Sequence, residues 1–231
     1  MTLEFTAVTF DASNAQAVAG FWGDLLDRTP VPDRGAVLLP GDETQVGLRF
    51  SAPTTGATGQ DVLHLHLTSD GDRSQGEVVE RALELGGSRV DVGQLPQEGH
   101  IVVADPEGNA FCVIPPGNNF LAGCGFLGEV SCDGSRAVGL FWRDTLGWEL
   151  VWDENGETAV QAPQGGTKLS WGGPPIEQKT GRSLQRFVLS TDDPPGEVER
   201  LTGLGAVVLG ESDDVIELAD PDGHEFAVRR R

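Results

Sequence analysis

Basic residues are scarce in this 231-residue sequence, where 16 lysines and arginines stand against 36 aspartates and glutamates and leave a formal net charge of −20. A field of that sign repels phosphate groups, so we expect no nucleic-acid partner and no binding to an anionic membrane surface. We interpret the acidic residues as a solvated surface and infer no basic partner from them.

Cysteines and long apolar runs are also few. The three cysteines, Cys112, Cys124 and Cys132, are an odd number without a C-x-x-C pair, which favours free thiols in a reducing compartment over a disulfide framework. No run approaches the ~18 apolar residues of a membrane helix, and the N-terminus lacks a secretory pattern. We therefore expect a soluble cytoplasmic protein.

One segment in the middle of the sequence is repeated at its end. Residues 100–114 and 215–228 each place two short apolar runs around the pattern Asp-Pro-acidic-Gly. Proline fixes φ, glycine accepts a positive φ, and aspartate bonds back to the backbone, so each segment predicts a β-hairpin. The shift from Asp105 to Asp220 is 220 − 105 = 115 residues, which places one hairpin at the end of each half.

Apolar periodicity predicts alternating strands and helices in the rest of the chain. For the first half it predicts strands at 3–11, 36–39, 45–50, 62–68 and 88–92, helices at 15–26 and 75–85, and a polar connection at 52–60. The second half repeats this order: Phe141-Trp142 follows Phe21-Trp22 at a shift of 141 − 21 = 120 residues. The repeat predicts tandem domains over 1–116 and 125–231, joined by a linker over 117–124.

These motifs resemble a known superfamily. Phe-Trp in the first helix of each half, Leu146-Gly147, a His-Leu-His-Leu strand at 64–67 and the closing hairpins resemble the vicinal oxygen chelate superfamily. It contains glyoxalase I, the bleomycin-resistance proteins and the extradiol dioxygenases. The sequence is most similar to actinobacterial glyoxalase-like domain proteins.

The resemblance implies an α+β fold of tandem glyoxalase-like domains, each of paired βαβββ units that form a curled mixed sheet around a cleft. Enzymes of the superfamily hold a divalent metal in such a cleft, using a residue on the first strand of each unit and a carboxylate on the last. Fold alone does not assign a reaction, because this superfamily contains lyases, isomerases, dioxygenases and simple binders.

Strand parity predicts which residues face the cleft. If Ala104 faces Ala110, the bulky residues Ile101, Val103, Phe111 and Val113 share the helix-packed face. His100 and Cys112 then lie on the opposite face, and His64 and His66 project together from their strand, about 7 Å apart. In the second half Arg186 replaces His64, and Glu129 is predicted to form an ion pair with it. Trp171 fits either the core or a pocket wall. The candidate cleft residues are His64, His66, His100, Cys112, Glu129, Arg186, Glu217 and Trp171.

The metal pattern that the resemblance implies is incomplete, since Cys112 and Ala227 occupy the closing-strand carboxylate positions. We therefore expect no metal or other cofactor, and no catalytic residue is assigned. Should a divalent metal (Zn, Fe, Mn or Ni) bind, the predicted ligands are His64, His66 and His100, with Cys112 converging on the same cleft.

Three functional hypotheses follow. The leading one is a binder of a small organic molecule that works without the usual metal, as bleomycin-resistance proteins do. The alternative is a divalent-metal-dependent lyase, isomerase or dioxygenase with an altered ligand set, so whether the protein is an enzyme stays open. The third is an interaction or structural protein whose cleft is filled by its own side chains. Fused domains can complete a cleft within one chain, which is compatible with a monomer or a homodimer.

Overall fold

The computed structural model describes residues 3–53, 62–69, 73–95, 97–176, 179–212 and 214–231, and it contains the repeated units in order. The first unit is β1 (Glu4–Asp11), α1 (Ala15–Leu26), β2 (Val31–Asp33), β3 (Ala36–Leu39) and β4 (Gly47–Ser51). The second is β5 (Leu63–Leu67), α2 (Gln75–Glu84), β6 (Ser88–Arg89), β7 (Ile101–Ala104) and β8 (Ala110–Val113). The third is β9 (Leu127–Cys132), α3 (Arg136–Leu146), β10 (Glu149–Glu154), β11 (Glu157–Gln161) and β12 (Lys168–Trp171). The fourth is β13 (Gln185–Thr191), α4 (Pro194–Leu204), β14 (Val207–Ser212), β15 (Val215–Ala219) and β16 (Glu225–Arg230).

This order confirms the α+β prediction and the four βαβββ units. The short strand β2 escaped the periodicity analysis because Val-Pro-Asp has no apolar alternation to detect. Most of the predicted connection at 52–60 lies outside the described residues. None of the described helices is long and apolar enough to cross a membrane.

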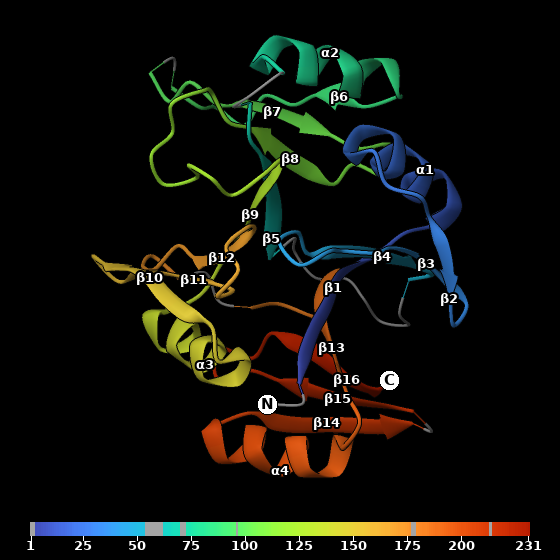
Figure 1. The fold of residues 1–231 in the computed structure, drawn as a ribbon, viewed down its shortest axis with the longest axis vertical. Helices are drawn as coiled ribbons and strands as arrows, with labels where there is room; N and C mark the ends of the chain where they lie inside the picture. The colour runs from blue at the N-terminus through green and yellow to red at the C-terminus, as the bar shows by residue number, and fades with distance from the viewer. Residues whose placement is uncertain (1–2, 54–61, 70–72, 96, 177–178, 213) are drawn as a thin grey trace.

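The strands form two eight-stranded mixed sheets in the described part of the chain (Figure 1). Sheet one has the order β14-β15-β16-β13-β1-β4-β3-β2, and sheet two has the order β10-β11-β12-β9-β5-β8-β7-β6. Each sheet is joined at its centre by an antiparallel pair from different halves of the sequence, β1 with β13 and β5 with β9. Sheet one therefore combines units one and four, and sheet two combines units two and three.

This pairing corrects the expectation that the two units of one domain share a sheet and a cleft. The units of one half contact each other through their helix-packed faces instead. In the first half Trp22 of α1 packs against Phe111 of β8, with ring centroids 4.9 Å apart, and in the second half Trp142 packs against Phe226 at 5.0 Å. The open faces of the sheets consequently unite units from different halves.

The repeated hairpin anchors this packing through its first aspartate. Asp105 is buried, accepts a 2.9 Å hydrogen bond from the indole Nε1 of Trp22, and also accepts the backbone N–H groups of Glu107 and Asn109. Asp220 repeats the arrangement with Trp142 at 3.1 Å. A buried carboxylate needs hydrogen-bond donors on both oxygens. The aspartate of the Asp-Pro-acidic-Gly turn takes them from its own turn and from the tryptophan of the Phe-Trp helix, and so joins the hairpin to that helix.

The second acidic residue of each hairpin caps a helix. Glu107 accepts the hydroxyl of Ser13 and the backbone N–H of Asn14 at 2.8 Å, directly before α1. Asp222 does the same for Ser135 before α3, at 2.8 Å to the hydroxyl and 2.6 Å to the backbone N–H. A carboxylate at the N-terminus of a helix satisfies free N–H groups and opposes the helix dipole.

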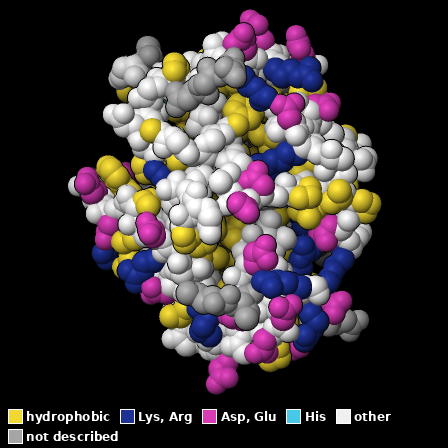
Figure 2. Space-filling view, in the orientation of Figure 1, with side chains coloured by type: hydrophobic (Ala, Val, Ile, Leu, Met, Phe, Trp, Pro, Cys, Tyr) yellow, Lys and Arg dark blue, Asp and Glu magenta, His cyan; other side chains and the backbone are white. Residues whose placement is uncertain are grey.

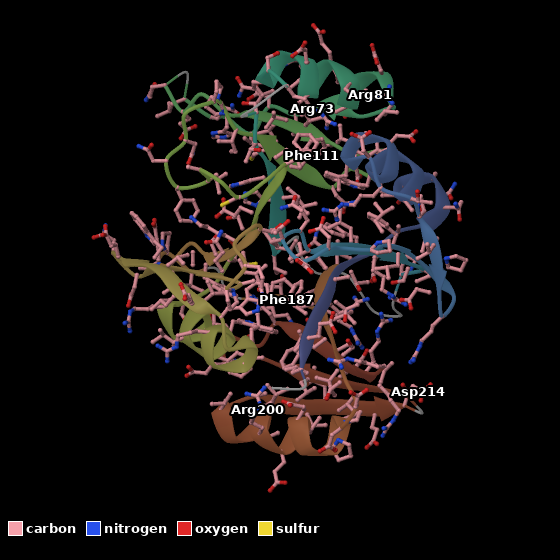
Figure 3. All side chains as sticks on the ribbon, in the orientation of Figure 1. Arg73, Arg81, Phe111, Phe187, Arg200 and Asp214 are labelled. Carbon is pink, nitrogen blue, oxygen red and sulfur yellow. The ribbon has the colours of Figure 1, made fainter. Side chains whose placement is uncertain are left out.

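The parity prediction is confirmed. Ala104 pairs with Ala110, and Val103, Phe111 and Val113 are fully buried in the main core, as are Leu218 and Val228 of the second half. Phe111 and Phe187 lie in the interior of the upper and lower parts of the molecule (Figure 3). Acidic side chains are spread over the visible surface, with basic ones between them (Figure 2).

Replacing either anchoring aspartate tests the contact on which this packing depends. We expect Asp105→Ala and Asp220→Ala each to lower the free energy of unfolding by about 3 kcal/mol, because each leaves a buried indole and turn amides without acceptors. Urea denaturation measures the loss. Glu80→Ala, at an exposed position of α2, is the control and should stay within about 0.5 kcal/mol of the parent. A loss for Asp105→Ala no larger than that of the control would contradict the anchoring role.

Candidate functional site

The open face of sheet one is occupied by ion pairs. The carboxylate of Asp33 accepts hydrogen bonds from the guanidinium groups of Arg49 and Arg229, each at 2.7 Å, and all three side chains are at most 15% exposed. Arg186 pairs with Asp11 at 2.7 Å, with side chains 11% and 2% exposed. These five charged side chains have partners within the fold, although the three arginines outnumber the two aspartates and leave a sum of +1.

Two predicted site residues belong to this face. The predicted ion pair between Glu129 and Arg186 is wrong, because β9 and β13 lie in different sheets and Arg186 binds Asp11 instead. Glu217 pairs with Arg182 at 2.5 Å. Arg186 and Glu217 are therefore separated from the histidines that the sequence analysis grouped with them.

The open face of sheet two brings four of the predicted residues together. His64 and His66 stand on β5 with ring centroids 4.8 Å apart, Cys112 is the β8 partner of His66, and Glu129 is its β9 partner. Nδ1 of His66 lies 2.6 Å from Oε2 of Glu129. We call His64, His66, Cys112 and Glu129 the histidine cluster.

Glu129 is buried, and both of its carboxylate oxygens have partners. His66 bonds to Oε2, and the hydroxyl of Ser170 on β12 donates to Oε1 at 2.5 Å. Burial opposes the charge, but the bonds from His66 and Ser170 outweigh it and keep the pKa of Glu129 below its ordinary value. Sequence reasoning missed Ser170, although its alternation with the core residues Leu169 and Trp171 was a usable signal.

The two histidines are driven to opposite protonation states. For His66, burial also opposes the charge, but the hydrogen bonds to Cys112 and Glu129 and the charge of Glu129 raise its pKa to about 9. For His64, desolvation and then the charge of His66 lower the pKa to about 4, and His100 adds to the lowering. At neutral pH the cluster therefore presents an imidazolium beside a neutral imidazole.

A cavity of about 300 Å³ adjoins the histidine cluster, and it is lined by Glu129 and by the hydrogen-bond partner of Glu129, Ser170. Its aromatic wall includes Phe120 and Trp152, whose rings meet edge to face with centroids 5.8 Å apart. Trp171 also lines the cavity, yet it is 1% exposed and stacks on Trp142, so it serves both the core and the wall.

The segment between the two repeats covers part of this face. Leu121 and Cys124 are buried against Val102, Cys112 and Ile114, which form a second, smaller apolar cluster. Lys168 holds the segment by donating to the backbone carbonyl of Phe120 and lying over its ring, 4.3 Å from the centroid. The segment thus covers the apolar residues Val102, Cys112 and Ile114, while the cavity beside Glu129 lies outside this apolar cluster.

The imidazole and thiol groups of the histidine cluster are also of the kind that bind a metal ion. The ligand atoms of His64, His66 and Cys112 lie within 4.8 Å of one another, and imidazole with thiolate suits zinc. Glu129 would orient His66 through Nδ1, as carboxylates do for metal-bound histidines. His100, which the sequence analysis placed in the ligand set, is not part of this group.

Four βαβββ units in two open sheets, with a polar cleft on one of them, define a protein of the vicinal oxygen chelate superfamily. The chain belongs to the glyoxalase-like domain family, whose model matches residues 7–114 and 129–229. No protein with curated annotation matches the sequence.

Solved structures agree with this fold. Glyoxalase I from Zea mays is 14% identical with a TM-score of 0.67, and the match covers 99% of this chain and 92% of the maize chain. A putative dioxygenase from Bacillus subtilis is 13% identical with a TM-score of 0.64, covering 99% of this chain and 85% of that one. At these identities the likeness concerns the fold alone.

The raised pKa of His66 predicts a pH dependence of stability. A group with a raised folded-state pKa contributes stability that is complete below its unfolded pKa, about 6.5, and is lost as the pH rises through about 9. We expect the difference in unfolding free energy between the parent and His66→Gln to shrink by on the order of 2 kcal/mol between about pH 6.5 and 9.5. Urea denaturation across this range, with NMR titration of the imidazole, measures it.

His64→Gln is the matched control. The lowered pKa of His64 confines any effect of its own titration on stability to pH values below about 6.5. In His64→Gln most of the loss of unfolding free energy between about pH 6.5 and 9.5 should therefore remain. An imidazole of His66 that titrates near its ordinary value would overturn the assignment.

Proposed function

We propose that the protein binds a small organic molecule with an acidic oxygen, such as a carboxylate or a phenolate, in the cleft of sheet two without the usual metal. The observation that carries the proposal is the His66–Glu129 pair at 2.6 Å, which keeps a 16% exposed imidazolium next to the cavity that Glu129 lines. Charge-assisted hydrogen bonds to an anionic oxygen are roughly twice as strong as neutral ones.

The surroundings of the pair support this ligand class. Nδ1 of His66 is used by Glu129, so the ring's other nitrogen is the one available to a ligand, in competition with the weakly accepting thiol of Cys112. The adjoining cavity of about 300 Å³ is at the lower end of the size of small-molecule pockets. Its aromatic wall of Phe120 and Trp152 suits an aromatic or otherwise planar ligand body.

Binding of aromatic carboxylates tests the proposal. We expect benzoate, salicylate or a larger aromatic acid to raise the melting temperature in a thermal-shift series and to bind in calorimetry, while the matching amides bind at least about tenfold more weakly. Binding should weaken above about pH 9, where His66 loses its proton.

Variants at matched positions locate the binding. His66→Gln should weaken it about tenfold by removing the charged donor, whereas His224→Gln, in the turn of the other sheet's hairpin, should leave it unchanged. Equal affinity for acid and amide, or an unaffected His66→Gln variant, would count against the proposal.

A second function is favoured by one observation, the convergence of His64, His66 and Cys112 within 4.8 Å. Three protein ligands with an open position are the arrangement of catalytic zinc sites. A bound divalent ion would supply a Lewis acid for a lyase, isomerase or dioxygenase reaction, with Glu129 orienting His66 from behind.

Metal analysis separates the two functions. Under the leading proposal the purified protein carries less than about a tenth of an equivalent of Zn, Fe, Mn or Ni and gains none on reconstitution. The second function would be established instead by a stoichiometric metal in the parent protein that is absent from both Cys112→Ser and His64→Gln. In the metal-loaded parent the imidazole of His66 would then no longer titrate.

A further inference from the structure

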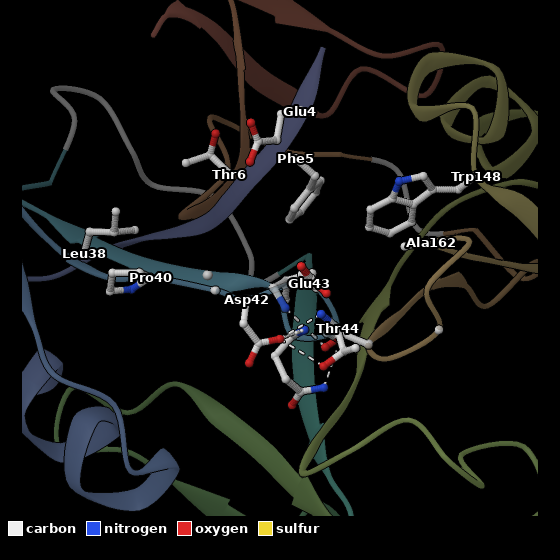
Figure 4. A pocket seen from close by; sticks show the side chains of 16 residues that line it. Glu4, Phe5, Thr6, Leu38, Pro40, Asp42, Glu43, Thr44, Trp148 and Ala162 are labelled. Carbon is white, nitrogen blue, oxygen red and sulfur yellow. Dashed lines mark hydrogen bonds between the residues drawn. The ribbon is translucent and has the colours of Figure 1, made fainter. Parts of the chain in front are cut away.

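A larger cavity, of about 420 Å³, lies away from the histidine cluster, where the two halves of the chain meet (Figure 4). The first half contributes the start of β1 and the loop between β3 and β4. The second half contributes Trp148 and the loop between β11 and β12. No residue of the histidine cluster lines it, so it is a separate site.

The floor of this cavity is rigid because both halves hold it. In the β3–β4 loop, Oδ1 of Asp42 accepts the backbone N–H groups of Thr44 and Gln45 at 2.7 and 2.8 Å. From the second half, the backbone N–H of Thr167 donates to the carbonyl of Thr44 at 2.7 Å. Gln45 donates to the carbonyl of Cys124 in the segment between the repeats and accepts the N–H of Leu127 at the start of β9. A preorganised wall loses little conformational entropy on binding.

Two aromatic rings form the side of the cavity. Phe5 and Trp148 lie with ring centroids 5.9 Å apart and an interplanar angle of 45°, and both are only partly buried. Figure 4 shows the two side chains at the same opening, above the loop that carries Asp42 and Glu43. Exposed aromatic faces attract a cation that lies within about 6 Å of the ring.

The charged residues that line the cavity are all acidic, while Arg28 contacts its wall from behind through the backbone carbonyl of Val46. Glu4, Asp42 and Glu43 line the cavity, and none of its sixteen lining residues is Lys, Arg or His. Glu43 makes no hydrogen bond or ion pair with any residue that the structure describes, while Glu4 has only an exposed contact with Arg231 at 3.4 Å, the kind worth little in solvent. The net charge of −20 adds a long-range field that concentrates cations.

We propose that this cavity between the two halves binds a small organic cation, an ammonium group on an apolar or aromatic body, with Phe5 and Trp148 as the aromatic faces and Glu43 as the counter-charge. An inorganic cation fits less well, because the wall is apolar and the carboxylate of Asp42 already serves its own loop. This ligand class is opposite in charge to that of the histidine cluster, and the two sites are occupied independently.

Calorimetry with benzyltrimethylammonium tests the proposal. The comparison probes, of similar size, are the neutral benzyl alcohol and the anionic phenylacetate. We expect the ammonium ion to bind about tenfold more tightly than benzyl alcohol, and phenylacetate not to bind here. Trp148→Leu should weaken binding about tenfold and Trp148→Phe should retain most of it, because the aromatic face is kept.

Charge variants distinguish the site from the general acidic field. Glu43→Gln should weaken ammonium binding about threefold to fivefold, whereas Glu154→Gln, an exposed acid at the far end of β10 that does not line the cavity, should not change it. Equal binding of the ammonium ion and benzyl alcohol, or equal losses in Glu43→Gln and Glu154→Gln, would overturn the proposal.

Binding of the ammonium ion at this cavity does not depend on the proposed binding of aromatic acids at the histidine cluster. His66→Gln should leave ammonium binding unchanged, and Glu43→Gln should leave binding of aromatic acids unchanged. A loss of ammonium binding in His66→Gln would contradict a separate cavity site, whatever the aromatic acids do.

Discussion

The antiparallel pairing of β5 with β9 is the contact on which the candidate site depends. It places Glu129 directly beside His66, although 63 residues separate them in the chain. Each histidine, thiol and carboxylate alone would be an ordinary side chain on a strand. The same register unites the second and third units in one sheet, so the cleft belongs to neither half of the sequence.

The buried charge of Glu129 explains why its neighbours are polar. An uncompensated carboxylate in the interior costs several kcal/mol, so each of its oxygens needs a donor. His66 and Ser170 provide those donors, and the same bonds that stabilise Glu129 raise the pKa of His66. The imidazolium that could receive a ligand is therefore a consequence of burying a carboxylate.

The open faces of the two sheets differ in how their charged side chains are paired. Sheet one pairs three arginines with Asp33 and Asp11 through contacts of 2.7 Å, and these side chains are at most 15% exposed. Sheet two pairs a histidine with a glutamate, and a histidine retains a second ring nitrogen that can act on another molecule. A fused pair of repeats can keep one face closed and rigid while the other stays open.

Local patterns in the sequence determined much of this protein: the duplication, the hairpins, the helices and the face on which each strand residue lies. Alternation fixes the face of His64, His66 and Cys112 because side chains on a strand alternate with a period of two, whatever the strand's neighbours are. The choice of neighbour follows from packing over the whole chain, which periodicity does not contain. Only the tertiary structure therefore decided that Glu129 meets His66 and not Arg186, that Ser170 completes the pair, and that the segment around Leu121 covers one end of the cleft.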